Sequence, residues 1–254
     1  MKIIGVVQAR MTSTRLPGKV LLQVLDKPLI VHMLERVAGS RLLDDLWLAT
    51  SEQAEDDLLA SVVEKAGFRV FRGSLDNVLS RFWHVGHMEK AEAVVRLTGD
   101  CPLHDPAVID AVVTYFVEHA SAADYVSNVL PPTYPDGLDT EVFSFAALDS
   151  AYHKATSSSD LEHVTPYVRR EAAVRGRIIN YTGPAPFAHL RWTLDEPEDY
   201  ELIKRVFEEL HPGKKSFGWL DVVAWQTEDP QRLRINSMHR RNEGLNKSKS
   251  NTKS

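Results

Sequence analysis

Residues 1–20 read Met-Lys-Ile-Ile-Gly-Val-Val-Gln-Ala-Arg-Met-Thr-Ser-Thr-Arg-Leu-Pro-Gly-Lys-Val, and the rest of the chain is organised around them. The run at 3–7 is short, apolar and β-branched, which predicts a buried strand. The loop after it holds Arg10, Arg15 and Lys19 with hydroxyl groups between them, and no acidic residue precedes them. Guanidinium, ammonium and hydroxyl groups beyond the carboxyl end of a strand are what a polyphosphate needs. An ordinary solvated basic loop is the alternative interpretation of the charge alone.

Strands alternate with amphipathic helices over the first half of the chain. This alternation predicts an α/β fold, a three-layer sandwich in which helices cover both faces of a mostly parallel sheet. Ligands of such sheets bind beyond the carboxyl ends of the strands. The expected strands are 3–7, 46–50, 68–71 and 93–97, and the expected helices are 28–39, 51–67, 77–87 and 106–119.

Composition and length bound the class of protein. The 254 residues suffice for one substantial core, and 43% hydrophobic and 26% charged residues are ordinary for a globular protein. A net charge of −5 argues against general nucleic-acid binding. One cysteine excludes an internal disulfide framework, and no apolar stretch approaches the roughly 20 residues of a membrane span. The first residues resemble a strand more than a signal peptide, so we expect a cytoplasmic enzyme with no membrane partner.

A second candidate site follows the strand at 93–97. Thr98 and Gly99 lead to Asp100, whose carboxylate would lie at the same sheet edge as the first loop. There it would most naturally hold Mg²⁺, which binds a few carboxylates together with phosphate oxygens. A Gly-Asp pair by itself is usually a turn, so this assignment depends on the first loop. We do not expect Cys101 to be a nucleophile, because no histidine is positioned locally to activate it.

The opening residues resemble those of the CMP-sugar synthetases, the cytidylyltransferases that activate 3-deoxy-octulosonate and nonulosonate acids. That family begins with a strand and then Ala-Arg-x-Gly-Ser-x-Arg-x-x-x-Lys. Thr12 stands here in place of the family glycine, and the residues in register are Ala9, Arg10, Ser13, Arg15 and Lys19. The resemblance implies a Rossmann-like sheet of the GT-A nucleotidyltransferase type. It also implies a reaction of CTP with an acidic 3-deoxy-keto sugar that gives CMP-sugar and pyrophosphate for surface polysaccharide biosynthesis.

The resemblance also implies roles for individual residues. Arg15, Lys19 and Asp100 would be catalytic. Asp195 falls on the closing motif of the family, a strand and an aspartate before Pro-Glu-Asp and a helix, as the second Mg²⁺ ligand. On physical grounds alone, residues 72–81 are equally well a turn followed by an exposed helix arginine. The residues expected to bind the nucleotide are Ala9, Arg10, Thr12, Ser13, Arg72, Arg81 and Thr98.

The sugar is expected to bind in the middle of the chain. Residues 138–143 alternate as a half-buried strand, which places Asp139 and Glu141 on one face, either to bind sugar hydroxyls or simply to be solvated. The stretches 137–143 and 162–167 resemble the spore-coat-polysaccharide branch of the family, which implies His163 and Tyr167 as substrate contacts. An ordinary core or surface histidine is the alternative for His163.

Later elements and the domain organisation complete the expectations. We expect a helix opened by a capping box at Ser159, strands at 178–181 and 190–193, and a helix from residue 197. Residues 1–238 would form one nucleotidyltransferase domain. Residues 124–192 would be its sugar-binding and dimerisation subregion, because the resemblance suggests a homodimer. Residues 239–254 are polar and basic and would form a disordered tail.

Two other classes of function stay open. A uridylyltransferase, guanylyltransferase or glycosyltransferase could share the sheet, although the Asp-x-Asp of a glycosyltransferase is absent at Asp100. A non-catalytic nucleotide-binding protein is the second alternative, and Thr12 keeps it open. The expected partners are CTP and an acidic sugar, with no nucleic acid.

Overall fold

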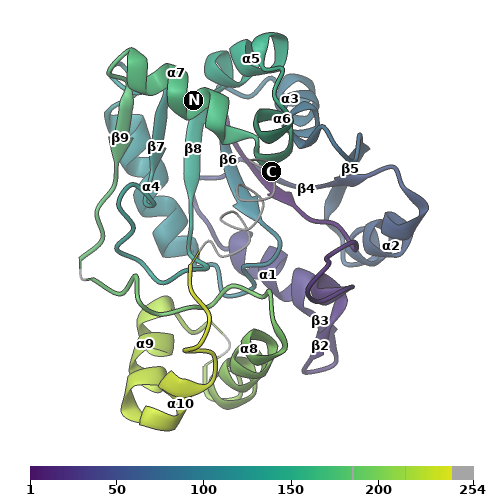
Figure 1. Cartoon of the computed structure of the whole chain (residues 1–254), viewed down its shortest axis with the longest axis vertical. Coiled ribbons are helices and arrows are strands. Elements are labelled where there is room, and N and C mark those ends of the chain that lie inside the picture. Colours follow the sequence, from purple (N-terminus) through teal and green to yellow (C-terminus); the bar gives the residue numbers. More distant parts are fainter. Residues whose placement is uncertain (185, 215, 242–254) are drawn as a thin grey trace, which may run out of the picture.

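The computed structural model describes residues 1–184, 186–214 and 216–241, and within these one seven-stranded sheet forms the centre of the molecule (Figure 1). Its strand order is β5-β4-β1-β6-β8-β7-β9. All neighbouring strands pair in parallel except β8, which is antiparallel to both β6 and β7. The strands are β1 (Ile3–Gln8), β4 (Asp45–Ser51), β5 (Arg69–Gly73), β6 (Ala93–Thr98), β7 (Tyr125–Ser127), β8 (Glu141–Ser144) and β9 (Ile178–Asn180).

Helices cover both faces of the sheet, because the central strands are largely apolar and successive side chains point to opposite faces. In β1, Ile3 and Val7 join one core, whereas Ile4 and Val6 join the other. The first core includes residues of α1 (Leu29–Val37), α2 (Asp57–Lys65) and α4 (Pro106–Glu118). The second includes residues of α3 (Val78–Met88), α5 (Phe145–Lys154) and α7 (Thr165–Val174), and α6 (Ser158–His163) packs beside α3. The predicted three-layer α/β sandwich with a mostly parallel sheet is therefore confirmed.

A further core lies beyond one end of the sheet, at the bottom of Figure 1. It contains the fully buried Leu138 and Trp192 from irregular segments, and Val24 from a short hairpin. This core fixes the segment that precedes α8, which matters for the site below. Its elements are β2 (Gln23–Val24), β3 (Lys27–Pro28), α8 (Pro197–Leu210), α9 (Trp219–Glu228) and α10 (Pro230–Arg234), and the chain also has the 3₁₀ turns η1 (Lys19–Leu21) and η2 (Ala54–Asp56).

Several predicted boundaries were wrong. Residues 190–193 form no strand in the described part of the chain; Arg191 makes only an isolated bridge with Asp136. The strand predicted at 138–143 begins at Glu141, because residues 130–140 follow an irregular path into the further core. Ser157, not Ser159, caps α6, since its hydroxyl accepts the backbone N–H of Asp160.

None of the helices among the described residues is both long and apolar enough to cross a membrane.

Candidate active site

The loop after β1 turns Lys19 into the molecule. The backbone N–H of Met11 donates to Asp56 Oδ1 at 2.7 Å, and that of Gly18 donates to the Met11 carbonyl at 3.0 Å. Gly18 has a φ of +69°, a left-handed conformation that suits glycine, and it starts η1. As a result Lys19 is buried, whereas Thr12 and Arg15 stay exposed.

Three segments that are distant in the sequence converge on the ammonium group of Lys19. Lys19 Nζ lies 3.3 Å from Asp100 Oδ2 and 2.8 Å from Asp195 Oδ1. Arg15 Nη2 lies 2.9 Å from the same Asp195 oxygen, and Arg15 Nη1 lies 3.3 Å from Glu196 Oε1. Two cationic and three anionic side chains thus form one cluster beyond the ends of β1 and β6.

Backbone contacts explain why these segments meet. β6 pairs with β1, and the Gly99 N–H donates to the Gln8 carbonyl at 2.8 Å. A Cβ at position 99 would lie 2.7 Å from the Cβ of Ala9, so only glycine allows this approach. The Leu194 N–H in turn donates to the Asp100 carbonyl at 2.7 Å, which places Asp195 beside Asp100.

The cluster is charged as it stands. Burial by itself raises the pKa of Asp100, but Lys19 and hydrogen bonds from Thr98 and Cys101 outweigh it and leave the pKa at about 2. Burial lowers the pKa of Lys19, yet the two aspartates outweigh it and raise that pKa above its ordinary value. Lys19 and Asp100 are therefore both ionised at neutral pH.

The donor set fits a hard divalent cation. Asp100 and Asp195 face a common point, since both contact the same nitrogen of Lys19. Among the residues that the structure describes, no three His, Cys, Asp or Glu side chains come together as a ready-made metal site. Two carboxylates without a third protein ligand suit Mg²⁺, which usually takes its remaining ligands from water and substrate phosphates.

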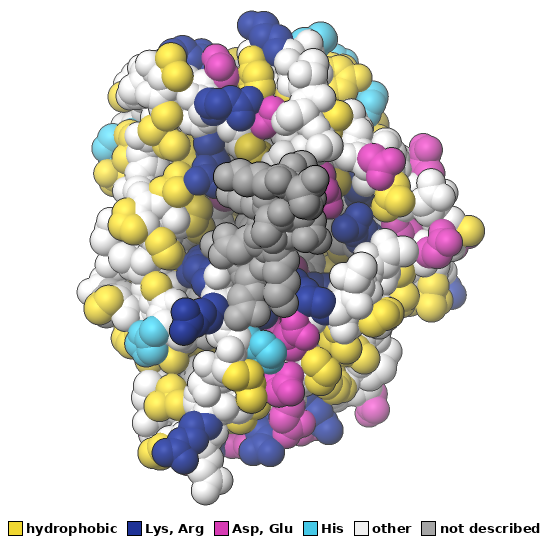
Figure 2. Space-filling view, in the orientation of Figure 1, with side chains coloured by type: hydrophobic (Ala, Val, Ile, Leu, Met, Phe, Trp, Pro, Cys, Tyr) yellow, Lys and Arg dark blue, Asp and Glu magenta, His cyan; other side chains and the backbone are white. Residues whose placement is uncertain are grey.

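The cluster lies in a cleft of about 1060 Å³ that runs from the β1 loop to α7. Lys and Arg side chains gather around the middle of this face of the molecule (Figure 2). Most of the residues predicted to form the site line this one cleft: Ala9, Arg10, Thr12, Ser13, Arg15, Lys19, Arg81, Thr98, Asp100, Asp139, Glu141, His163 and Asp195.

Arg72 and Tyr167 are not brought to the cleft. The Arg72 guanidinium donates to the carbonyls of Ser51 and Gln53, each at 3.0 Å, and pairs with Asp57 at 2.6 Å. These contacts hold its side chain at the edge of the sheet, so the structure does not bring Arg72 together with the other residues predicted to bind the nucleotide. The ring of Tyr167 lies under the guanidinium of Arg170 at 5.4 Å and does not line the cleft, so its predicted contact with the substrate has no support here.

Arg81 lines the cleft but is not the exposed helix arginine that the pattern allowed. It is 2% exposed, and its guanidinium donates to the carbonyls of Ala49 and Leu75 at 3.2 and 3.0 Å. These bonds tie α3 to the end of β4. Arg81 therefore helps to build the wall of the cleft.

Glu141 lines the cleft, is buried, and uses both carboxylate oxygens in contacts with other side chains. It forms an ion pair with Arg96, accepts a hydrogen bond from the hydroxyl of Tyr125, and accepts one from Thr165 Oγ1 at 2.9 Å. Burial raises the pKa of Glu141, but Arg96 and these hydroxyls outweigh it and lower the pKa. Glu141 is thus not on a solvated strand face; it orients Arg96, which also donates to Gln8 Oε1 at 3.0 Å.

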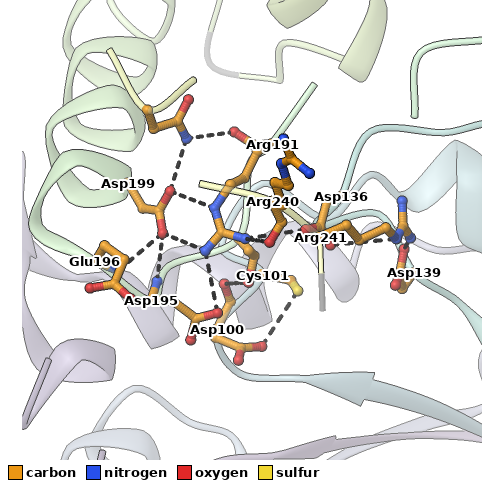
Figure 3. A network of polar contacts seen from close by, with 12 residues as sticks. Asp100, Cys101, Asp136, Asp139, Arg191, Asp195, Glu196, Asp199, Arg240 and Arg241 are labelled. Atoms are coloured by element: carbon orange, nitrogen blue, oxygen red, sulfur yellow. Dashed lines mark hydrogen bonds and ion pairs between the residues drawn. The ribbon is translucent and has the colours of Figure 1, made fainter. Parts of the chain in front are cut away.

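Sequence reasoning missed a chain of charges that continues from Asp195 (Figure 3). Arg191 links Asp195 to Asp136, and Arg241 links Asp136 to Asp139. Burial and Asp139 raise the pKa of Asp136 to about 7, against the opposing effect of the two arginines. The sequence carries little indication of these residues, because Asp136 occurs in a Pro-Asp-Gly sequence typical of a turn and Arg191 in a stretch with the pattern of a strand.

Residues 239–241 pack against the site, so the predicted disordered tail does not begin at 239. His239 Nε2 lies 3.2 Å from Glu198 Oε2, the carbonyl of Arg240 accepts a hydrogen bond from Arg191 at 3.3 Å, and Arg241 pairs with Asp139. The remainder of that prediction, 242–254, lies outside the described residues.

Comparisons with known proteins find similarity to cytidylyltransferases. A sequence model of the cytidylyltransferase family matches residues 4–217. The spore coat polysaccharide biosynthesis protein SpsF of Bacillus subtilis (strain 168) is 37% identical over 81% of this chain and 86% of its own length. The 3-deoxy-manno-octulosonate cytidylyltransferase of Solibacter usitatus is 39% identical over 82% of this chain and 95% of its own length.

A solved structure is also similar over nearly the whole chain. The structure of a cytidylyltransferase from Leptospira borgpetersenii serovar Hardjo-bovis superposes with a TM-score of 0.86 and 30% sequence identity, and the match covers 92% of this chain and 97% of that one. The sheet order and the charged cluster described above therefore lie within a shared fold.

Proposed function

The chain belongs to the cytidylyltransferase family, and from that premise we propose that it activates an acidic 3-deoxy-keto sugar with CTP for surface polysaccharide biosynthesis. The products would be CMP-sugar and pyrophosphate. One observation carries this proposal beyond the family: the ammonium of Lys19 lies within 3.3 Å of both Asp100 and Asp195. That convergence of three distant segments supports a charged pocket that would hold a magnesium triphosphate.

The reaction is a nucleotidyl transfer. The anomeric hydroxyl of the sugar attacks the α-phosphorus in line, a P–O bond to the sugar forms, and the bond to the leaving pyrophosphate breaks while the hydroxyl proton departs. Chemistry of this kind depends on positioning and on charge stabilisation more than on covalent catalysis. The protein supplies both with fixed cations beside a cleft that is large enough for two substrates.

The basic loop would bind the nucleotide. Arg15 and Lys19 would contact the triphosphate and stabilise the charge that develops on pyrophosphate. Arg10 and Ser13 line the same cleft and would hold the base, ribose or phosphates. Mg²⁺, held by Asp100 and Asp195, would neutralise phosphate charge and lower the pKa of the attacking hydroxyl when bound.

Arg169 supports an acidic sugar as the second substrate. It lines the cleft on α7, is half-buried, and forms no hydrogen bond or salt bridge with any side chain or carbonyl in the described ranges. The neighbouring cations Arg96 and Arg241 are already paired with Glu141 and Asp139. The Arg169 guanidinium is therefore available to a carboxylate, which its planar fork binds in bidentate fashion.

Pyrophosphate release tests the proposal. The purified chain is incubated with Mg²⁺, each of CTP, UTP, GTP and ATP, and a panel of acidic keto sugars and neutral sugar 1-phosphates. We expect release with CTP and an acidic keto sugar. Release with UTP or GTP and a sugar 1-phosphate would make the chain a different nucleotidyltransferase, and CTP binding without turnover of any sugar would make it a nucleotide-binding protein.

We also propose that the chain works in the cytoplasm as a homodimer formed through residues 124–192. Light scattering of the purified chain tests the oligomeric state. A monomer at micromolar concentration would contradict the dimer and leave the pyrophosphate assay as the test of the reaction.

A further inference from the structure

Arg191 contacts three acidic side chains at once. It is 7% exposed, and its guanidinium reaches Asp199, Asp195 and Asp136 (Figure 3). Asp195 is the candidate metal ligand, and Asp136 lines the cleft on the side of Asp139. Arg191 therefore stands between two carboxylates of the cleft that lie far apart in the sequence.

Asp199 anchors the guanidinium. The pair is a bidentate fork, with Nε 2.9 Å from Oδ1 and Nη2 2.8 Å from Oδ2. Asp199 is fully buried at the start of α8, where Oδ2 also accepts the backbone N–H groups of Asp195 and Glu196 at 3.0 Å. Asn236 donates to its other oxygen at 2.9 Å. Because Asp199 is itself held by these backbone and side-chain hydrogen bonds, its two bonds to Arg191 fix the plane of the guanidinium group.

The two carboxylate oxygens of Asp195 have different partners. Oδ2 lies 3.4 Å from Arg191 Nη2, whereas Oδ1 faces the cleft and contacts Lys19 and Arg15. The remaining nitrogen, Nη1, lies 3.4 Å from Asp136 Oδ2. One planar group thus contacts both the carboxylate beside the basic loop and a second carboxylate that lines the same cleft.

We propose that Arg191 is a positioning residue that orients Asp195 toward the metal and couples it to Asp136. This inference rests on the proposed function. A purely structural role would require only the fork with Asp199, and that fork leaves the contacts with Asp195 and Asp136 unexplained. Lysine cannot replace the residue, since a single ammonium cannot hold a fork with Asp199 and reach the other two carboxylates in fixed directions.

The test compares Arg191→Lys with wild type and with a matched control, Arg36→Lys. Arg36 is a half-buried arginine whose guanidinium donates to the carbonyls of Leu103, His104 and Phe217, and it does not line the cleft. Both substitutions should lower the unfolding temperature. Mn²⁺ affinity in the presence of CTP, measured by electron paramagnetic resonance, and kcat for pyrophosphate release are then determined on folded protein.

For Arg191→Lys we expect about tenfold weaker Mn²⁺ binding and a kcat at least about 30-fold lower, with the KM for CTP within threefold. Arg36→Lys should keep Mn²⁺ affinity and kcat within twofold. If Arg191→Lys keeps both within twofold as well, the inference is overturned. If both variants lose activity only in proportion to the unfolded fraction, the role of Arg191 is structural and the inference again fails.

A second variant covers the case in which Arg191→Lys does not fold. Asp199→Asn keeps the shape of the anchor but weakens the fork, and it should weaken Mn²⁺ binding in the same direction; unchanged affinity would overturn the inference. Wild-type protein separates the two levels of the argument. Wild type that neither binds Mn²⁺ with CTP nor releases pyrophosphate contradicts the proposed function, whereas active wild type with unaffected variants contradicts only the role of Arg191.

Discussion

Lys19 Nζ lies 2.8 Å from Asp195 Oδ1, although 176 positions of sequence separate the two residues. The contact closes the cluster, because Asp195 belongs to the segment before α8 and Lys19 to the loop after the first strand. An ammonium at this point holds two carboxylates together that would otherwise repel each other. In the proposed reaction this ammonium would also lie beside the triphosphate.

Removing a member of this cluster should reduce activity far more than stability. We expect Lys19→Ala and Asp100→Asn to lower kcat/KM for pyrophosphate release at least about 100-fold, since each removes charge from the reacting groups. Circular dichroism should show folded protein in both cases. Lys27→Ala is the control, because Lys27 pairs with the exposed Glu35 and does not line the cleft. Near wild-type turnover in either cluster variant would refute the assignment.

Arg169 should act on the sugar and not on the nucleotide. For Arg169→Ala we expect the KM for the acidic sugar to rise about tenfold or more, the loss of one charge-assisted contact, while the KM for CTP stays within twofold. Arg175→Ala is the control, since that arginine follows α7 directly, does not line the cleft and pairs with Asp124 at 3.6 Å. Equal effects on the two KM values would speak against a carboxylate contact.

Glu141 should prove to be a structural acid. Glu141→Ala leaves Arg96 without its ion pair at 15% side-chain exposure, and we expect the free energy of unfolding to fall by about 3 kcal/mol. Asp139→Ala should cost about 1 kcal/mol or less, because that carboxylate is more exposed, at 34%, and among the described residues its ion pair is with Arg241. Urea denaturation of both variants measures the difference, and equal losses would contradict it.

Asp136 should make stability depend on pH. Its pKa is raised from 3.8 to about 7, so between these values the folded state binds more protons at this group than the unfolded state. The group therefore contributes a loss of stability as pH rises from about 4 to 7. Asp136→Asn removes this contribution, so the variant should gain stability relative to wild type between pH 4 and pH 8. Unfolding temperatures of wild type and Asp136→Asn, measured across that pH range, test this prediction. A difference between the two proteins that does not change with pH would contradict it.

The fold and the centre of the site could be predicted from local patterns. The buried strand at 3–7 and the residues that follow β6 are short-range signals, and parallel pairing brings their ends together. Lys19 and Asp100 follow from these local patterns, whereas Asp195 was assigned through the resemblance to the closing motif of the family.

The rest of the site depends on long-range packing that no local pattern encodes. Arg191 occurs in Leu-Arg-Trp-Thr, which has the alternation of a strand, but its flanking residues Leu190 and Trp192 are buried in the core under α8 and α9. Arg72 lies away from the cleft for a related reason. It follows the strand predicted at 68–71, but β5 continues to Gly73, and nearby carbonyls and Asp57 hold the guanidinium of Arg72.

The bond from the Leu194 N–H to the Asp100 carbonyl has a consequence for dissecting the molecule. A fragment ending at residue 184 would still contain all seven strands of the sheet, together with Lys19 and Asp100. It would lack Asp195 and the arginine behind it, so we expect a scaffold with half of its charged pocket. Adding the remaining piece in trans would show whether pocket assembly can be separated from the folding of the sheet.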